Sequence, residues 1–501
     1  MQKETNVANN LLFSILNSAI LGLVNLAYPI FIGLLYNPIT MGNFSVLNSW
    51  AIILSIPIVN GIAPSVSRFI ATNSENENNE LEKIGIDFSI IYLLLILILF
   101  PILSAFIYKL TFLEIFLVFV LLLFTIFHYL FRYIMQGFEQ FKKLLYFELV
   151  GFLVFLPLGI IFCFFSKLIP ILSVSGNYYL LLVPMVVYHL VFDLTFIIIQ
   201  LRKSRLGNLI KINKILAVKI LKYAFFIGFS NILILGLSQI QIIISDNYLS
   251  ELEVGILSFW NSAISPISLI TVSLATILIP RLTNLQINSI DLSLDFTNSI
   301  NWGLSLLIIP LAGMIYLIIA AYPQIFDLII PSEYYTSIYW PIIILLSLKE
   351  VSNILWCPTT SMFATTEKDI KYNALVSLLY TIFVIVSWII FIPLLGIFGF
   401  AIGIAIGSVL SYFSTQIIAL IIYKKKIGSQ ILFSLIVFGI FGLGYYLISL
   451  IPIVVLIIWS ILSVVLVILG IIKITKVLKM KEYSTRYQSE AEIPSSIIEL
   501  E

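Results

Sequence analysis

The sequence predicts an all-α integral membrane protein with about fourteen transmembrane helices, and three observations support this fold class. Of the 501 residues, 61% are hydrophobic and only 10% are charged, whereas soluble globular proteins have about 25% charged residues. The mean hydropathy is +1.12. The apolar runs reach the ~20 residues that a helix needs to cross a bilayer, and they do not alternate as membrane β-strands do. These features exclude a soluble enzyme, a disordered chain and a disulfide-rich secreted module.

The apolar runs predict the spans in chain order. We expect helices over residues 9–36, 43–71, 84–108, 112–136, 144–167, 178–200, 219–247, 254–280, 297–322, 335–364, 372–393, 397–423, 429–450 and 452–473. The two cysteines, Cys163 and Cys357, lie within apolar runs and are expected to be buried packing residues. The net charge of +2 gives no indication of a nucleic-acid partner, and we expect no metal and no cofactor.

The positions of the basic residues predict the orientation. When both termini are placed in the cytoplasm, 24 of the 27 Lys and Arg residues fall on the cytoplasmic side, Lys109 and Lys167 fall outside, and Lys349 lies within a span. This asymmetry follows the positive-inside rule, so we expect cytoplasmic N- and C-termini. Richness in Ile, Asn and Lys is typical of an AT-rich prokaryotic genome. We therefore expect a multi-pass protein of a prokaryotic plasma membrane, acting as a monomer.

An internal repeat relates the second and eighth predicted spans. Residues 42–70 and 255–283 share seven identities in 29 positions at an offset of 213, including Asn48 with Asn261 and Arg68 with Arg281. Because the copies lie six spans apart, they point the same way through the membrane, which predicts two parallel six-helix lobes around a cavity, as in alternating-access transporters. The expected domains are an N-lobe at 9–200, a cytoplasmic linker at 201–218, a C-lobe at 219–423, helices 13 and 14 at 429–473, and a cytoplasmic tail at 474–501.

Three stretches carry a resemblance to a known family. Residues 246–263, DNYLSELEVGILSFWNSA, resemble the junction of the seventh and eighth spans in polysaccharide flippases; residues 42–45 and 61–68 resemble its first-lobe counterpart; and residues 397–403, IFGFAIG, resemble a glycine-rich twelfth span. Over residues 9–475 the chain resembles the fourteen-span layout of the multidrug/oligosaccharidyl-lipid/polysaccharide exporter superfamily. The resemblance implies a flippase that moves a polyprenyl-diphosphate oligosaccharide from the inner to the outer leaflet for surface glycan assembly.

Two other branches of this superfamily fit the residues less well. The lipid II flippases carry a more basic first-lobe cavity, whereas the first-lobe spans here hold mainly Arg68 and Arg132. The multidrug branch usually has twelve spans, with an acidic residue in the first span of many members. The first span here has Asn17 and Asn25 but no acid. A cation-coupled multidrug exporter remains the alternative function, and a membrane polysaccharide polymerase is a third.

Charged and amide side chains within the spans are the candidate substrate-binding residues, because charges in lipid are costly and are therefore functional or paired. Arg68 and Arg281 end their spans at the inside face, where they could bind a diphosphate or reach lipid headgroups. Lys349 could contact phosphate or sugar acids. Amides suit sugar hydroxyls, and they also join helices. The amides chosen as substrate-binding candidates are Asn25, Asn48, Asn60 and Asn261.

Three acids are candidates for coupling transport to H⁺ or Na⁺. Glu350 follows Lys349 in the tenth span, and because helix neighbours point about 100° apart we expect each to pair with another residue or to face the cavity. Asp193 shares a helix face with His189, which predicts either a proton relay or a hydrogen-bonded structural pair. Asp246 ends the seventh span, where it could act as a gate or cap or lie exposed at the interface.

Two further expectations concern the fourth and fifth spans. His128 and Arg132 lie four residues apart near the inside end of the fourth span, and we expect them to contact lipid headgroups. Glu148, in the fifth span, is the acid that could neutralise Arg132. No nucleophile elbow, phosphate loop or paired carboxylate site is present, so we expect no enzymatic activity.

Overall fold

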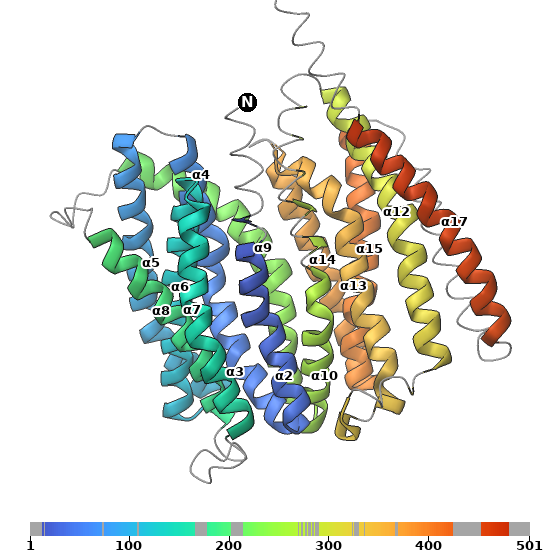
Figure 1. Ribbon diagram of the computed structural model, residues 1–501, viewed down its shortest axis with the longest axis horizontal. Helices are drawn as coiled ribbons and strands as arrows, with labels where there is room; N and C mark the ends of the chain where they lie inside the picture. The colour runs from blue at the N-terminus through green and yellow to red at the C-terminus, as the bar shows by residue number, and fades with distance from the viewer. Residues whose placement is uncertain are drawn as a thin grey trace, which may run out of the picture. The chain divides into compact units, whose positions relative to one another are not determined.

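A computed structural model of the chain describes residues 13–14, 16–72, 75–107, 110–165, 178–201, 214–268, isolated positions between 270 and 285, 290–322, 324, 330–334, 336–365, 369–423 and 452–479. Within these residues every regular element is helical (Figure 1). Twelve helices in this described part of the chain are long and apolar enough to cross a membrane. The all-α fold class and the multi-pass membrane protein that the composition predicts are therefore confirmed.

The twelve membrane-crossing helices correspond to twelve of the fourteen predicted spans. They cover Leu16–Leu35, Pro38–Ile70, Glu80–Ile102, Phe112–Gly137, Phe141–Cys163, Tyr178–Ile199, Gly228–Tyr248, Ile290–Ala321, Ile338–Phe363, Ile370–Leu395, Ile397–Tyr423 and Val454–Lys476. The predicted span at 254–280 begins as α10 (Glu251–Ile264), and much of its second half lies outside the described residues. The predicted span at 429–450 lies wholly outside them.

The chain forms two compact units. Unit 1 contains Met1–Leu269, Ile330–Tyr335 and Ile370–Ser411, and unit 2 contains Ile270–Ile329, Thr336–Asp369 and Tyr412–Glu501. Unit 1 holds α2 (Tyr28–Leu35), α3 (Pro38–Pro57), α4 (Ala63–Thr72), α5 (Glu75–Ile107), α6 (Phe112–Gly137), α7 (Phe141–Ile160), α8 (Val183–Leu201), α9 (Lys214–Tyr248), α10, α14 (Ile370–Leu395) and the first half of α15 (Ile397–Tyr423). Unit 2 holds α12 (Ile290–Ala321), α13 (Thr336–Phe363), the rest of α15 and α17 (Pro452–Lys479). The lobe boundaries and the orientation of the termini stay predictions.

The two helices of the sequence repeat begin in the same way and pack on each other. Asn37 caps α3 by accepting a hydrogen bond from the Thr40 backbone N–H (2.9 Å), and Ser250, 213 residues later, caps α10 through the Glu253 N–H (3.4 Å). Side-chain oxygens at these positions satisfy backbone donors that the helix leaves unpaired. Both helices are thus fixed at equivalent starting points, which extends the repeat beyond its matched residues.

Glycines at the start of the repeat allow α3 and α10 to approach closely. A Cβ added at Gly42 would lie 2.9 Å from the backbone nitrogen of Gly255, and one added at Gly255 would overlap the backbone carbonyl of Pro38. Small residues at a crossing let membrane helices meet backbone to backbone, where packing rather than the hydrophobic effect holds them together. The repeat-matched pair of glycines therefore forms the centre of this crossing.

The glycine-rich segment of α15 packs against α14. Gly396, with a φ of +54°, ends α14 in the left-handed conformation that glycine adopts without a steric cost. The chain then returns as α15, whose glycines at 399, 403 and 407 lie four residues apart on one face. Added Cβ atoms at these three positions would overlap Phe391, Trp388 and Val384 of α14. The stripe thus fixes one face of α14 and leaves another face for α9.

In unit 2, the last described helix is an integral part of the fold. α17 lies alongside α12 (Figure 1), where a Cβ at Gly470 would lie 2.9 Å from the Gly303 carbonyl oxygen. The side chains of Trp459 and Ser463 both donate to the carbonyl oxygen of Pro310, at 3.3 and 3.2 Å. Pro310 lies inside α12, so these two hydrogen bonds join α17 to α12 in addition to the close packing of their glycines.

Candidate functional site

Among the residues that the structure describes, the most concentrated group of buried charges lies among α6, α7 and α8 of unit 1, and Glu148 is at its centre. One carboxylate oxygen of Glu148 accepts a hydrogen bond from Arg132 Nη1 at 3.2 Å and lies 3.4 Å from Nε2 of His128. The other oxygen accepts a hydrogen bond from the hydroxyl of Tyr188. Glu148 and His128 are fully buried. We call the group His128, Arg132, Glu148, Tyr188, His189 and Asp193 the polar cluster.

Helical spacing explains how the polar cluster assembles. His128 and Arg132 lie one turn apart on α6, so both point at the same carboxylate of α7. The predicted neutralisation of Arg132 by Glu148 is confirmed. The predicted contact of His128 and Arg132 with lipid headgroups is wrong, because both side chains are buried in contact with Glu148.

The two histidines connect the ion pair to α8. The rings of His128 and His189 stand edge to face with centroids 4.7 Å apart, and His128 also lies against Phe192 at 3.9 Å. Asp193, one turn after His189, is 97% buried. Among the described residues, neither Asp193 carboxyl oxygen nor Nδ1 of His189 has a hydrogen-bond partner. The structural hydrogen bond predicted between His189 and Asp193 is therefore not formed.

Unsatisfied polar atoms of this kind have chemical consequences. A buried carboxyl without a donor is costly when ionised and much less so when it carries a proton. Asp193 is therefore the carboxyl of the polar cluster that would be most easily kept protonated, and its predicted role in ion coupling stays a prediction. This arrangement makes the polar cluster the candidate ion-coupling site of unit 1.

The structure describes one of the two arginines predicted to bind phosphate. Arg68, at the end of the second span, is exposed on α4, and its guanidinium carbon lies 4.2 Å from the ring centre of Tyr223 in α9. Such stacking holds the planar guanidinium in one orientation. Its repeat partner Arg281 lies outside the described residues. The two arginines therefore stay predicted substrate ligands.

The adjacent pair on α13 differs from its prediction. Lys349 Nζ lies 3.2 Å from Glu350 Oε1, and Asn353 donates a hydrogen bond of 3.3 Å to the other oxygen of Glu350. The expectation that Lys349 and Glu350 pair poorly with each other is wrong, because the four-carbon stem of lysine bends across the 100° between helix neighbours. The expectation that Glu350 has another partner is met by Asn353. Glu350 is buried and already compensated, which distinguishes it from Asp193.

The predicted amide ligands and the third acid are half-buried. Asn25 donates to the Tyr129 hydroxyl at 3.3 Å, beside the polar cluster. Asn231 of α9 donates to the backbone oxygen of Asn60 at 3.0 Å, where α3 gives way to a π-helical turn at Ile58–Ile62. Asn48, Asn261 and Asp246 lie half-buried in α3, α10 and α9. The amides that make contacts join helices, and their role in sugar binding stays a prediction.

Sequence reasoning missed the participation of Tyr188. Its hydroxyl donates a hydrogen bond to the second carboxylate oxygen of Glu148. The chain has 25 tyrosines, and nothing in their spacing distinguishes Tyr188 from the others. Only its position could have indicated a role for Tyr188, because it directly precedes His189 in a span that holds two ionisable residues. Helix order places α8 against α7, and only that packing brings Tyr188 to Glu148.

Comparison with known proteins identifies the fold. No protein-family model and no curated protein matches the sequence. Among solved structures, the chain is similar to the lipid II flippase MurJ in an inward closed conformation, with 15% identity, a TM-score of 0.60, and coverage of 91% of this chain and 98% of that chain. It is similar to an inward-facing multidrug resistance MATE family transporter of the MOP superfamily, with 16% identity, a TM-score of 0.57 and coverage of 83% and 98%. A MOP superfamily transporter from Pyrococcus furiosus shares 13% identity at a TM-score of 0.50, over 84% and 96% of the two chains. The fold is that of the transporters of this superfamily.

Proposed function

We propose that the chain is a transporter of the MOP superfamily and, within it, a flippase that carries a polyprenyl-diphosphate oligosaccharide to the outer leaflet by alternating access. The observation that carries this proposal is α17, a membrane-crossing helix after the twelfth predicted span that packs closely on α12. The structural match to the multidrug resistance transporter covers 83% of this chain, whereas the match to the lipid II flippase covers 91%. The additional C-terminal helix supports the flippase branch over the multidrug branch.

We expect the headgroup to contact basic side chains, and the two described candidates belong to different units, Arg68 to unit 1 and Lys349 to unit 2. Arg68 offers a planar guanidinium at an exposed position on α4, and Lys349 offers an ammonium that is nearly buried on α13. Phosphate contacts of this type are charge-assisted hydrogen bonds. The tail of the substrate stays in hydrocarbon while its headgroup crosses.

Replacing Arg68 tests the predicted phosphate contact. Arg68→Ala should lower the rate of headgroup exposure about tenfold or more, since a hydrogen bond to a charged group contributes ~1.5–3 kcal/mol. Tyr223→Phe is the matched control, because it keeps the aromatic face under the guanidinium and should leave the rate unchanged. Exposure of the sugar outside intact cells, followed with an impermeant lectin, gives the measurement. An Arg68→Ala rate equal to that of the unaltered chain would remove Arg68 from the mechanism.

Energy is expected to come from a proton gradient acting through the polar cluster. Asp193→Asn should abolish the response of transport to an imposed pH gradient, because the amide cannot be ionised, while Asp193→Glu should retain it. Transport in vesicles with and without the gradient measures the response. Glu350→Gln and Asp246→Asn, tested in parallel, should keep the response if Asp193 is the coupling carboxyl. A gradient response that survives Asp193→Asn and is lost in either of the other two would move the coupling site to that residue.

The biological test compares cells with and without the chain. Cells that lack it should accumulate lipid-linked oligosaccharide in the inner leaflet and lose the surface glycan, with unchanged susceptibility to cationic drugs. Normal surface glycan combined with greater drug susceptibility would favour the cation-coupled multidrug exporter instead.

A further inference from the structure

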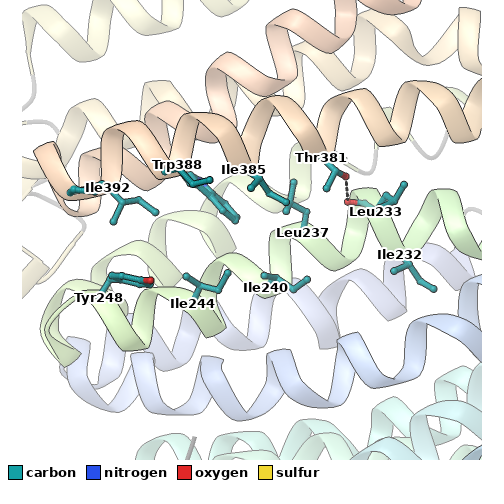
Figure 2. A pocket seen from close by; sticks show the side chains of 12 residues that line it. Ile232, Leu233, Leu237, Ile240, Ile244, Tyr248, Thr381, Ile385, Trp388 and Ile392 are labelled. Atoms are coloured by element: carbon teal, nitrogen blue, oxygen red, sulfur yellow. Dashed lines mark hydrogen bonds between the residues drawn. The ribbon is translucent and has the colours of Figure 1, made fainter. Parts of the chain in front are cut away.

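An apolar groove lies between α9 and α14 within unit 1. It encloses about 510 Å³, a volume within the ~300–1,000 Å³ range of small-molecule pockets. Figure 2 shows its side chains converging from the two helices, with the hydrogen bond from Thr381 to the carbonyl oxygen of Leu233 toward one end. Both walls belong to segments that cross the membrane, so the groove lies at hydrocarbon depth.

Apart from the hydroxyl of Tyr248 at one end, the walls offer little to a polar ligand (Figure 2). Most of the twelve lining side chains are aliphatic, and none carries a charge. The Thr381 hydroxyl is hydrogen-bonded to carbonyl oxygens of Leu233 and Ser377, and the Trp388 indole N–H donates to the Phe400 carbonyl oxygen at 3.1 Å. Sites for drugs or sugars place a few polar groups to orient the ligand. This groove instead fits an occupant that needs no orientation by hydrogen bonds, namely hydrocarbon.

The length of the groove decides which hydrocarbon fits. On α9 the lining residues extend over 232–248 and on α14 over 381–393, or about 24 and 18 Å of helix at ~1.5 Å per residue. One leaflet is only about 15 Å deep, half of the ~30 Å hydrocarbon core. A phospholipid acyl chain ends near the midplane, whereas an isoprenoid chain of many units continues past it. The groove is therefore longer than one leaflet is deep, so a chain that fills it has to continue past the midplane.

The groove is open to the side and closed at its floor. Ile385 and Ile389 of its rim are 43% and 70% exposed, whereas Leu237 and Trp388 are buried beneath them. A chain can thus enter laterally from the bilayer. None of the lining residues is basic, so the groove cannot hold a phosphate, and the headgroup must be bound elsewhere.

We infer that the groove between α9 and α14 binds the polyprenyl chain of the carrier lipid while its diphosphate-sugar headgroup crosses the membrane. This inference rests on the proposed function and adds a binding site for the tail. In a bilayer that is itself apolar, tail binding must come from packing in a shaped groove. Filling the groove should therefore weaken tail binding without touching any charged residue.

Photolabelling tests the inference directly. The full chain is reconstituted in vesicles of phosphatidylethanolamine and phosphatidylglycerol with polyprenyl monophosphate that carries a diazirine within its isoprenoid chain. We expect labelling of peptides from 232–248 or 381–393, and we expect excess unlabelled polyprenyl monophosphate to suppress it. A phosphatidylglycerol with a diazirine in its acyl chain should label these peptides far less. Equal labelling by the acyl-chain probe would overturn the assignment and make the groove a site for bulk lipid.

Matched tryptophan variants show whether the groove itself is labelled. Ile240→Trp fills the α9 wall and should reduce labelling about tenfold, which corresponds to a modest loss of packing. Leu235→Trp, on the same helix outside the groove, should leave labelling unchanged. Ile385→Trp and Ile390→Trp form the same pair on α14 and decide the matter if Ile240→Trp does not fold. Labelling that resists both groove-filling variants would contradict the inference.

The same vesicles separate this inference from the proposed function. Specific labelling in a chain that translocates no lipid-linked sugar would support the tail site and reject the flippase proposal. Translocation that proceeds without specific labelling of the groove, or undiminished by Ile385→Trp, would reject the tail site and leave the flippase proposal intact.

Discussion

Replacing Glu148 by glutamine should lower the free energy of unfolding by about 3–5 kcal/mol, the cost of leaving a buried charge without its partner. The change removes the negative charge that faces Arg132 Nη1 at 3.2 Å and His128 Nε2 at 3.4 Å, within a site where Glu148 itself is fully buried. The Arg132 side chain is itself buried, so it would be left without its carboxylate partner and without access to water. Equilibrium unfolding of the purified chain in detergent measures the loss.

The matched double variant separates charge from packing. Arg132→Met combined with Glu148→Leu removes both charges and keeps apolar bulk, so it should recover most of the stability lost in Glu148→Gln. A Glu148→Gln chain as stable as the unaltered one would show that the ion pair of the polar cluster contributes nothing to the fold. A double variant less stable than Glu148→Gln would assign the effect to packing around Tyr188 instead.

Among the described glycines of unit 1, Gly255 should lose the most stability when it is replaced by alanine. Its Cβ would overlap the backbone carbonyl of Pro38, and a backbone atom at the first turn of α3 cannot rotate away as a side chain can. The helices must separate at the Gly42–Gly255 crossing, and we expect a loss of about 3 kcal/mol or more, at the upper end of overpacking effects. The fraction of chain that remains monodisperse after heating gives a direct measurement.

Gly236→Ala is the control for this prediction. At Gly236 in α9, the nearest atom to an added Cβ is the end of the Ile56 side chain at 3.7 Å, an ordinary contact. Alanine favours a helix over glycine by about 1 kcal/mol, so this variant should be as stable as the unaltered chain or more stable. Equal stability of the two alanine variants would contradict the close crossing of α3 and α10.

The helices could be predicted from the sequence because an apolar run of ~20 residues has one stable form in lipid. The repeat offset was also informative, since it pairs Gly42 with Gly255 and, beyond the matched stretch, the helix caps Asn37 and Ser250. Pairing Arg132 with Glu148 was predictable because few acids lie in the first-lobe spans.

The remaining features depend on packing that hydropathy does not encode. We predicted that His128 and Arg132 contact lipid headgroups because they lie near the end of a span, but α7 and α8 cover both side chains. The angle between helix neighbours argued against a Lys349–Glu350 contact, but a flexible side chain overcomes that angle. The sequence does not show which neighbouring helix an apolar or aromatic side chain faces. The contact of Tyr188 with Glu148 and the groove between α9 and α14 could therefore not be predicted from residue spacing.

The most direct test of the flippase proposal uses vesicles that contain only the purified chain, phospholipid and a polyprenyl-diphosphate oligosaccharide. We expect sugars that begin in the inner leaflet to become accessible to an impermeant glycosidase added outside, with no increase in glycan length. Vesicles without the chain should keep these sugars protected. Continued protection in the presence of a folded chain, together with efflux of a cationic dye, would contradict the proposal in favour of a multidrug exporter, and lengthening of the glycan would indicate a polymerase.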